Sequence, residues 1–357
     1  AKDAFDMGIE LFVMDDGWFG KRDDDNSGLG DWYPNEKKLG CTLKELGEKI
    51  TATGMKFGIW FEPESISIDS DLYRAHPDWV IQQPGRLPNL SRNELVLDFS
   101  RVDVQDYILE RIRAILTDAP ISYIKWDMNR SICDKYSNQL DALHQGEFAH
   151  RYILGLYRVF EAIYQEFPEV IIESCSGGGG RFDAGILYYT PQIWCSDNTD
   201  AISRLDIQYG TSFGYPVSAM GAHVSAVPNH QTGRVTPIET RGCVAMSGTF
   251  GYELDITKMT AEDKEVVRHQ IERFHEFYSL IQYGDYYRLI SPKHPYTVWE
   301  FVNENKSEAL VNAVHARVEA CMTPIHVKIK GLKEDANYLV TLLDEEMYEK
   351  WHLHNCI

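Results

Sequence analysis

The stretch Tyr123-Ile124-Lys125-Trp126-Asp127-Met128-Asn129-Arg130 decides the fold. It begins as a short apolar strand and ends in charged and polar residues. An unpaired carboxylate is too costly to bury together with the apolar half. We therefore expect the strand to leave a core and deliver its polar end to a wet or ligand-filled edge. A spacing of two residues places Lys125, Asp127 and Asn129 on one face of the strand. Asp127 is our candidate nucleophile, and its two neighbours are candidates for holding a substrate.

Several other short apolar runs end in the same way, and amphipathic stretches lie between them. This alternation predicts a parallel sheet, and seven strands within residues 1–284 predict a (β/α)8 TIM-type barrel. Active sites in such barrels lie at the carboxyl ends of the strands, where five of these runs carry acidic, glycine or cysteine residues. The first strand is missing, and we expect its place to be before Ala1. The predicted strands are residues 11–14, 57–61, 123–126, 170–172, 193–195, 217–220 and 243–246, and the predicted helices are 42–52, 102–116, 146–166, 201–213 and 261–283.

The pattern changes near residue 285, where alternating stretches without a helical period begin. These stretches, at 296–302, 308–314, 325–329 and 338–343, predict a small antiparallel β-sandwich. We therefore divide the chain into a catalytic barrel domain, residues 1–284, and a C-terminal β-sandwich domain, residues 285–357. We expect this second domain to be incomplete, because residues 350–357 continue no strand pattern.

The composition excludes several classes of partner. The chain has 357 residues, of which 44% are hydrophobic and 25% charged, as in an ordinary globular protein. Its 54 acidic and 35 basic residues give a formal net charge of −19. This charge argues against nucleic acid, anionic membrane surfaces and polyanionic substrates, and it favours a neutral small-molecule substrate. No apolar run reaches the ~18–20 residues of a membrane span, so we expect no membrane partner.

The cysteines point to a reducing compartment. There are 7 of them, they are scattered, and none forms a C-x-x-C pair. This pattern predicts no disulfide framework and no zinc site, and it favours a cytoplasmic location. The zinc-hydrolase patterns H-E-x-x-H and H-x-x-E-H are also missing from the sequence. We expect no metal and no cofactor.

Two carboxylates on different strand ends are what a retaining glycoside hydrolase needs. Asp127 and Asp197 are the candidates, since a barrel brings their strand ends together. One would attack the anomeric carbon, and the other would protonate the leaving oxygen and then activate water. Lys125 would keep the nucleophile ionised, while burial or the charge of Asp127 would raise the pKa of Asp197. The alternative is that each aspartate caps the following helix or forms a surface ion pair.

Other candidate residues have equally plain structural alternatives. Asp15 and Asp16 end another strand and suit either a sugar diol or a divalent metal, but turn or capping roles are open. Trp60 either stacks on a sugar or belongs to the core. Arg92 lies in a polar loop, where a solvated arginine is common.

The glycine-rich loop at 177–180 lacks both the P-loop and the dinucleotide-binding spacings. Its glycines are better read as letting the backbone approach a ligand closely. Cys175 has no histidine partner at a familiar spacing, so we read it as a small residue that shapes a pocket rather than a nucleophile.

Four motifs in order give the chain a family resemblance. They are FVMDDGWFG at 12–20, KWDMNR at 125–130, ESCSGGGGRF at 173–182 and WCSDNTDA at 194–201. With these motifs, residues 1 to roughly 340 resemble the bacterial α-galactosidases of glycoside hydrolase family 36. That family joins an N-terminal β-supersandwich, a (β/α)8 barrel and a C-terminal β domain.

The resemblance implies retaining hydrolysis of terminal α-galactosides, as in melibiose and raffinose, and a homotetrameric parent protein. It implies Asp127 as nucleophile and Asp197, rather than Asp200, as acid/base. Asp15 and Asp16 would bind the 4- and 6-hydroxyls of galactose. The rest of the sugar pocket implied by the resemblance comprises Lys125, Asn129, Arg92, Cys175, Gly177 and Trp60.

The chain departs from the family pattern at both ends. We expect the N-terminal sandwich and the first barrel strand to lie outside this sequence, and we expect the likeness to stop after about Leu343. We expect an open barrel to expose strand edges, and hence a chain that is poorly stable or inactive on its own. Three alternatives to a glycoside hydrolase stay open: an α-galactosyl transferase acting on a sugar acceptor, an inactive α-galactoside-binding fragment, and a Mg²⁺-dependent phosphohydrolase using Asp15 and Asp16.

Overall fold

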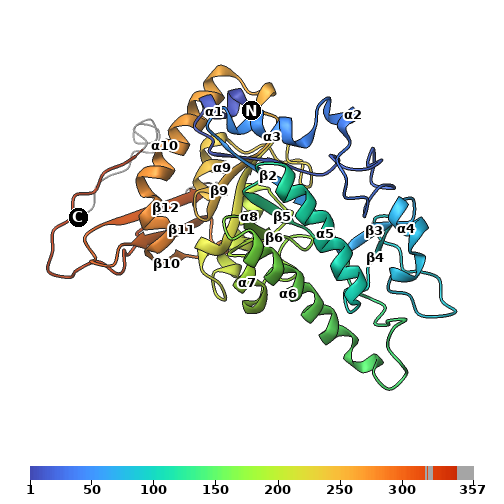
Figure 1. Cartoon of the computed structure of the whole chain (residues 1–357). Coiled ribbons are helices and arrows are strands. Elements are labelled where there is room, and N and C mark those ends of the chain that lie inside the picture. Colours follow the sequence, from blue (N-terminus) through green and yellow to red (C-terminus); the bar gives the residue numbers. More distant parts are fainter. Residues whose placement is uncertain (318–319, 321–324, 344–357) are drawn as a thin grey trace.

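The centre of the molecule is a parallel sheet of seven strands (Figure 1). The computed structural model describes residues 1–317, 320 and 325–343. Every neighbouring pair in the sheet is parallel, and helices alternate with strands along the chain. This confirms the predicted barrel-type α/β fold. In sheet order the strands are β1 (Leu11–Met14), β2 (Lys56–Phe61), β5 (Tyr123–Trp126), β6 (Ile171–Ser174), β7 (Gln192–Trp194), β8 (Met220–Ser225) and β9 (Thr249–Glu253).

All five predicted helices are confirmed, within a few residues at their ends. Local signals set some of these ends. Thr42 and Glu45 form a reciprocal capping box at the start of α3, and Asp200 caps α8. The helices are α1 (Lys2–Asp6), α2 (Glu36–Leu39), α3 (Leu43–Thr51), α4 (Asp71–Ala75), α5 (Val102–Asp118), α6 (Phe148–Glu166), α7 (Ala184–Tyr189), α8 (Ala201–Thr211), α9 (Ile238–Ala245) and α10 (Ala261–Tyr283).

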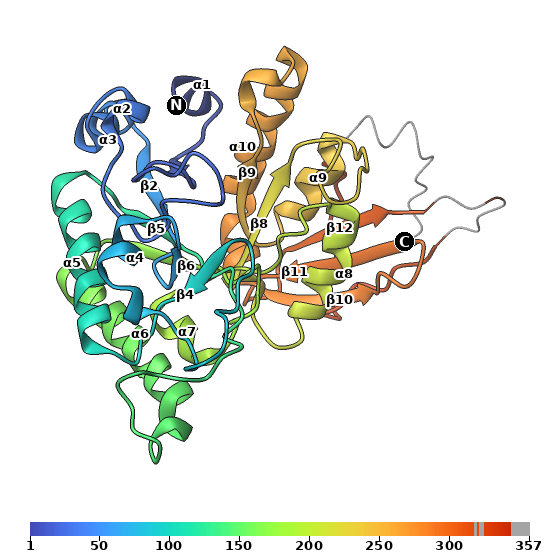
Figure 2. The same cartoon turned by 90° about the vertical axis from the view of Figure 1, so that its right-hand side faces the viewer.

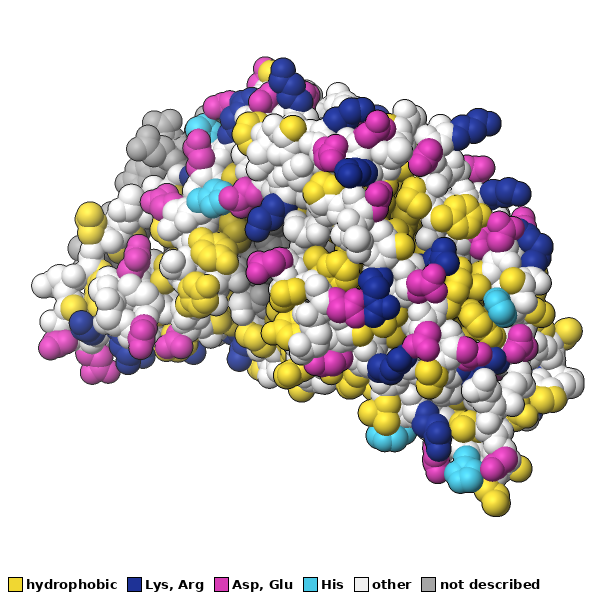
Figure 3. All heavy atoms as spheres, viewed as in Figure 1, with side chains coloured by type: hydrophobic (Ala, Val, Ile, Leu, Met, Phe, Trp, Pro, Cys, Tyr) yellow, Lys and Arg dark blue, Asp and Glu magenta, His cyan; other side chains and the backbone are white. Residues whose placement is uncertain are grey.

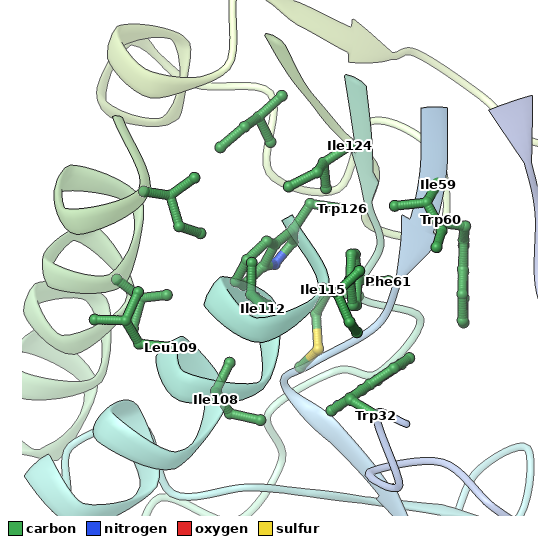
Figure 4. Close-up of a cluster of buried hydrophobic side chains, with 14 of the residues drawn as sticks. Trp32, Ile59, Trp60, Phe61, Ile108, Leu109, Ile112, Ile115, Ile124 and Trp126 are labelled. Atoms are coloured by element: carbon green, nitrogen blue, oxygen red, sulfur yellow. The ribbon is translucent and has the colours of Figure 1, made fainter. Parts of the chain in front are cut away.

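The apolar faces of these helices cover the sheet. Figure 4 shows Ile108, Ile112 and Ile115 of α5 directed at the strands, where Ile124 and Trp126 of β5 meet them. The first three recur at helical spacing, so they form one stripe along α5. Trp126 is fully buried. The core therefore fixes β5 up to the residue that precedes Asp127.

The two outer strands of the sheet are connected through helices. In the described part of the chain, β1 and β9 end the sheet and neither pairs with an eighth strand. The short helix α1, which leads into β1, packs instead beside α10, which follows β9 (Figures 1 and 2). Lys264 Nζ lies 2.9 Å from Asp3 Oδ2, and Met7 shares an apolar cluster with Ile271. These contacts hold the first strand to the last helix.

A second, antiparallel sheet follows α10 at once. It consists of β10 (Asp285–Ile290), β11 (Tyr296–Val302) and β12 (Ala309–His315), and it packs against α9 and α10. Met220 of the barrel and Phe301 of β11 belong to one buried cluster. The two sheets therefore share part of their core.

Four predicted strands are wrong or displaced. Residues 325–329 and 338–343 form no strand, although their pattern alternates; several of their apolar side chains are exposed, Leu339 by 93%. Residues 217–219 form a 3₁₀ turn, and the strand starts only at Met220. Residues 243–245 lie in α9, and the seventh strand is β9. A short apolar run does not distinguish a strand from a buried helix end. The expected end of the second domain, residues 350–357, lies outside the described residues.

The surface agrees with the mixed composition. On the face in Figure 3, acidic and basic side chains are interspersed and no broad basic patch is visible. Within the residues that the structure describes, no helix combines the length and apolarity that crossing a bilayer requires.

A helical glycine offers a test of how closely α6 packs. A Cβ on Gly155 would lie 1.9 Å from Phe99 O and 2.4 Å from Gln105 Nε2. We expect Gly155→Ala to lower the free energy of unfolding by about 1–3 kcal/mol, because the overpacked helix must move away. The matched control is Gly210→Ala in α8, where a Cβ would meet nothing within 4 Å. The free energy of unfolding of that variant should rise by about 0.5–1 kcal/mol, because alanine has a higher helix propensity than glycine. Urea unfolding of both variants checks the contrast, and equal effects would contradict it.

Candidate active site

Asp127 is held by three donors at the carboxyl end of β5. Its Oδ1 accepts from the Met128 backbone N–H at 2.8 Å. Its Oδ2 accepts from Asn129 Nδ2 at 2.8 Å and from Trp60 Nε1 at 3.3 Å. The side chain is 7% exposed. The carboxylate is therefore fixed in one orientation, and the donors include two residues predicted for the sugar pocket, Trp60 and Asn129.

Lys125 lies on the same strand and bridges to β1. Its Nζ lies 2.9 Å from Asp15 Oδ2. Burial lowers the pKa of Lys125, but the carboxylates of Asp15 and Glu173 outweigh burial and raise that pKa above its ordinary value. Lys125 therefore stays positively charged beside the nucleophile. The structure brings Lys125 and Asp15 together, as the sequence predicted for a shared site.

Asp16 is engaged differently from Asp15. Arg22, which is buried, donates to both oxygens of Asp16, at 2.9 and 3.1 Å. Such a two-point contact fixes the plane of the carboxylate. Asp16 still has free lone pairs for a sugar hydroxyl, since an ionised carboxylate accepts about four hydrogen bonds. Because Lys125 and Arg22 already neutralise Asp15 and Asp16, a divalent cation there would have to displace two bound cations.

Asp197 follows β7, and its side chain reaches the exposed surface while the atoms around it still remove part of its solvent. Burial raises the pKa of the Asp197 carboxyl, and the negative charge of Asp127 raises it further. This is the direction that a proton donor at neutral pH requires. The two carboxylates thus interact electrostatically, and this interaction contributes to the raised pKa of Asp197.

The glycine-rich loop packs on the segment that carries Asp197. Gly178 has φ +84°, and a Cβ there would lie 2.8 Å from the Ser196 Cα. A Cβ on Gly179 would lie 2.9 Å from Cys195 O. These two glycines therefore admit a protein backbone, not a ligand as the sequence had suggested. Gly177, with φ +52° and no atom near its would-be Cβ, is the one that faces open space.

Cys175 lies against the nucleophile. The residue is 2% exposed, and its thiol is near enough to Asp127 to feel the charge of that carboxylate. Burial raises the pKa of the Cys175 thiol well above its usual value, and the charge of Asp127 adds to that effect. A neutral thiol is a poor nucleophile, so its place here is that of a small residue in the wall of the site.

Asp200, the rejected candidate for the acid/base, has a structural environment. It is buried, and its side chain accepts from the N–H of Ser203 at 3.0 Å as the cap of α8. It also forms an ion pair with Arg234. These contacts give Asp200 a structural role as a helix cap and ion-pair partner, so the structure offers no reason to prefer it to Asp197.

Arg92 lies at the margin of the site. Its φ is +52° and its side chain is 46% exposed, with Nε 3.9 Å from Glu94 Oε1. Its contact is thus with a buried acid behind the nucleophile. A direct role in holding sugar stays a prediction.

Sequence reasoning missed several charged residues around the site. Glu64 is fully buried and accepts from Trp126, Tyr152 and Arg181. Glu62 and Glu94 are buried close to Asp127. The only available signal was the acidic segment 62–64 that follows β2 directly. Nothing local marked Glu94, which the small β3–β4 ladder (Ser65–Ser67 with Glu94–Val96) brings to the same place.

The fold and the site together define the class. A parallel barrel-type sheet whose strand ends carry two interacting carboxylates, one with a raised pKa, is the arrangement of a glycoside hydrolase. Comparison with known proteins narrows this class. Residues 1–284 match the family model Melibiase, and residues 296–352 match the glycosyl hydrolase family 36 C-terminal domain. The chain therefore belongs to the family 36 glycoside hydrolases.

Relatives of this family are close in sequence and in structure. Alpha-galactosidase AgaA of Geobacillus stearothermophilus is 52% identical over 354 residues, which are 98% of this chain and 49% of AgaA. The bifunctional alpha-galactosidase/sucrose kinase AgaSK of Mediterraneibacter gnavus is 54% identical over 340 residues, 95% of this chain and 36% of that protein. The crystal structure of AgaA superposes with a TM-score of 0.92, at 53% identity, and covers 94% of this chain and 47% of AgaA. The chain thus spans between about a third and a half of the length of these relatives.

Proposed function

We propose that this protein is a retaining α-galactosidase that hydrolyses terminal α-D-galactosides of the melibiose and raffinose type. The observation that carries the proposal is the asymmetry of the two carboxylates. Asp127 is fixed by donors and adjoins a charged lysine, whereas burial and Asp127 raise the pKa of Asp197. An AgaA variant has been crystallised with raffinose, which supports the substrate class.

The proposed reaction has two displacements. Asp127 attacks the anomeric carbon from the face opposite the leaving group, while Asp197 gives its proton to the glycosidic oxygen. The result is a β-linked galactosyl ester on Asp127 and a released sugar. Asp197, now ionised, takes a proton from water, and that water displaces Asp127 to give α-galactose. Retention requires the two carboxyl groups to lie ~5–5.5 Å apart around the bound sugar.

We assign sugar binding to the remaining residues by the same reasoning. Asp15 and Asp16 would accept from the 4- and 6-hydroxyls, with Lys125 and Arg22 setting their orientation. Lys125 and Asn129 would hold hydroxyls next to the nucleophile, and Trp60, Arg92, Cys175 and Gly177 would complete the wall. We further propose a homo-oligomeric parent protein. The five described cysteines are all free, which supports a cytoplasmic location.

The test is the stereochemistry of the first product. We expect full-length protein to release α-galactose first from p-nitrophenyl α-galactoside, as followed by proton NMR before mutarotation. A β-galactose product would overturn the retaining mechanism. Adding sucrose as acceptor separates the transferase, which would form a new galactoside at the expense of free galactose. A chelator should leave the rate unchanged, whereas a Mg²⁺-dependent phosphohydrolase would lose its activity.

A further inference from the structure

Two glutamates lie behind the proposed nucleophile without access to solvent. Glu62 follows β2 and Glu94 begins β4, and both are 0% exposed. The charge of Glu94 acts on Glu62 more strongly than that of any other residue, and the charge of Asp127 acts on both. Three acidic groups from three different strands thus converge in one buried place.

Glu62 hydrogen-bonds to Asn129, and Asn129 hydrogen-bonds to Asp127. Glu62 Oε1 accepts from the Asn129 backbone N–H at 2.6 Å and from Ser65 Oγ at 3.3 Å. The Asn129 side chain in turn donates to Asp127 Oδ2 at 2.8 Å. The position of Glu62 therefore sets where Asn129 meets the nucleophile.

The other carboxyl oxygens of the pair lack hydrogen bonds. Glu62 Oε2 and both Oε atoms of Glu94 are buried and accept none. Two unpaired buried carboxylates beside Asp127 would be very costly. A proton on one of the pair removes one charge and provides a donor.

The neighbouring arginines neutralise the pair only partly. Arg22 is bound to Asp16, and Arg130 donates to the backbone carbonyls of Asn89, Ser91 and Glu94. Arg92 reaches only within 3.9 Å of Glu94 Oε1. The cations thus support one negative charge on the pair, and they offer no direct hydrogen bond to its free oxygens.

The titration of the pair agrees with this geometry. Burial raises the pKa of Glu62 to about 8, and the charges of Glu94 and Asp127 contribute. Burial also raises the pKa of Glu94 to about 7, against the opposing effect of Arg92, Arg22 and Arg130. Because the two groups interact, they titrate together rather than separately.

We propose that Glu62 and Glu94 hold one proton between them and act as a positioning pair that presents Asn129 to Asp127. The pair carries one negative charge in total, and its proton bridges oxygens that otherwise have no partner. The catalytic consequences of this inference rest on the proposed function, but the shared proton does not.

The first experiment observes the proton without turnover. Full-length protein labelled with ¹³C at the glutamate side-chain carboxyl is compared by infrared spectroscopy at pH 7 with Glu62→Gln and Glu94→Gln. We expect a protonated-carboxyl band in the wild type that is lost in each single variant, because the remaining glutamate then ionises. A band that is equal in all three proteins would overturn the proposal, whether or not the protein is an α-galactosidase.

The second experiment measures how the charge of the Glu62–Glu94 pair affects the pH dependence of kcat/KM. Each single glutamine variant keeps one negative charge and should keep the acid limb of the wild type. The double variant loses that charge, so ionisation of the neighbouring site becomes easier and the acid limb should move down by about one pH unit. A shift already present in the single variants would mean that both glutamates are ionised, and no shift in the double variant would mean that neither is. Either result would overturn the shared proton.

Two further variants separate positioning from stability. Glu62→Ala should lower kcat about 10- to 100-fold with little change in KM, because Asn129 loses its support, and Glu62→Gln should restore most of kcat. The control is Glu300→Gln, which alters another fully buried glutamate, in β11 of the second sheet. It should leave the acid limb and kcat unchanged. If Glu62→Ala kept the wild-type kcat, the positioning role would be refuted.

Discussion

Replacing Asp127 with asparagine is expected to lower kcat about 10⁴- to 10⁶-fold, as loss of a nucleophile does in other covalent mechanisms. The amide cannot form the galactosyl ester. It should still bind substrate, because the other residues proposed for the sugar pocket, such as Asp15 and Trp60, are unchanged. Calorimetry should show that the variant still binds raffinose. An assay with p-nitrophenyl α-galactoside should show that its turnover is lost.

The stability of this variant needs its own measurement. Donors reach both oxygens of Asp127, from Met128 on Oδ1 and from Asn129 and Trp60 on Oδ2. In either orientation the amide of asparagine turns its NH₂ group toward one of these donors. We expect this to lower the free energy of unfolding by about 1–3 kcal/mol. Thermal unfolding should show a lower midpoint but a folded protein at the assay temperature.

The role itself is tested by rescue and by labelling. With Asp127→Gly, azide should enter the vacated space and give β-galactosyl azide, because it attacks from the face of the missing carboxylate. A 2-deoxy-2-fluoro galactosyl reagent should label the wild-type peptide that contains Asp127. Labelling of another residue, or formation of the α-azide with this variant, would contradict the assignment.

The sequence predicted those parts of the fold that have local signals. Apolar runs ending in acids located β1, β2, β5, β6 and β7, because a buried strand and the polar residue after it are adjacent in the chain. The same logic brought Asp15, Lys125 and Asp127 to one edge of the sheet. The bounds of β8 were not predicted, because its polar His223 and Ser225 interrupt the apolar run. The strand β9 was not predicted, because it has few aliphatic residues.

The buried acids behind the site had no local signal at all. Glu94 reaches Glu62 only through the β3–β4 ladder and the loop that precedes it. Pairing of short strands depends on tertiary contacts that composition does not encode. A buried glutamate in a single sequence also looks the same as an exposed one. The reactive residues at the strand ends could therefore be predicted from the sequence. The buried glutamates behind them, Glu62 and Glu94, could not.

Replacing Asp197 with asparagine is expected to affect substrates unequally. A sugar leaving group needs the proton that Asp197 supplies, so kcat/KM for raffinose should fall about 10²- to 10⁴-fold. The p-nitrophenolate group leaves with little protonation, so the first step with that substrate should be much less affected. Azide should accelerate the variant and give α-galactosyl azide, because it attacks the galactosyl ester on Asp127 in place of water.

The pH dependence follows from the raised pKa. Burial and the charge of Asp127 raise the pKa of Asp197, so the proton donor persists to a higher pH than an ordinary aspartic acid allows. Activity toward raffinose depends on the protonated form and is lost as the pH rises through that pKa. In Asp197→Asn this basic limb of kcat/KM should disappear, while the acid limb should remain.

Asp200 provides the matched control, since it lies three positions further along the same segment. Asp200→Asn weakens the cap of α8 and the ion pair with Arg234, which should cost about 0.5–2 kcal/mol of stability. It should not change the ratio of raffinose to p-nitrophenyl galactoside turnover. If Asp200→Asn rather than Asp197→Asn showed the dependence on the leaving group, the acid/base would have to be reassigned to the helix cap, and the raised pKa of Asp197 would have no catalytic meaning.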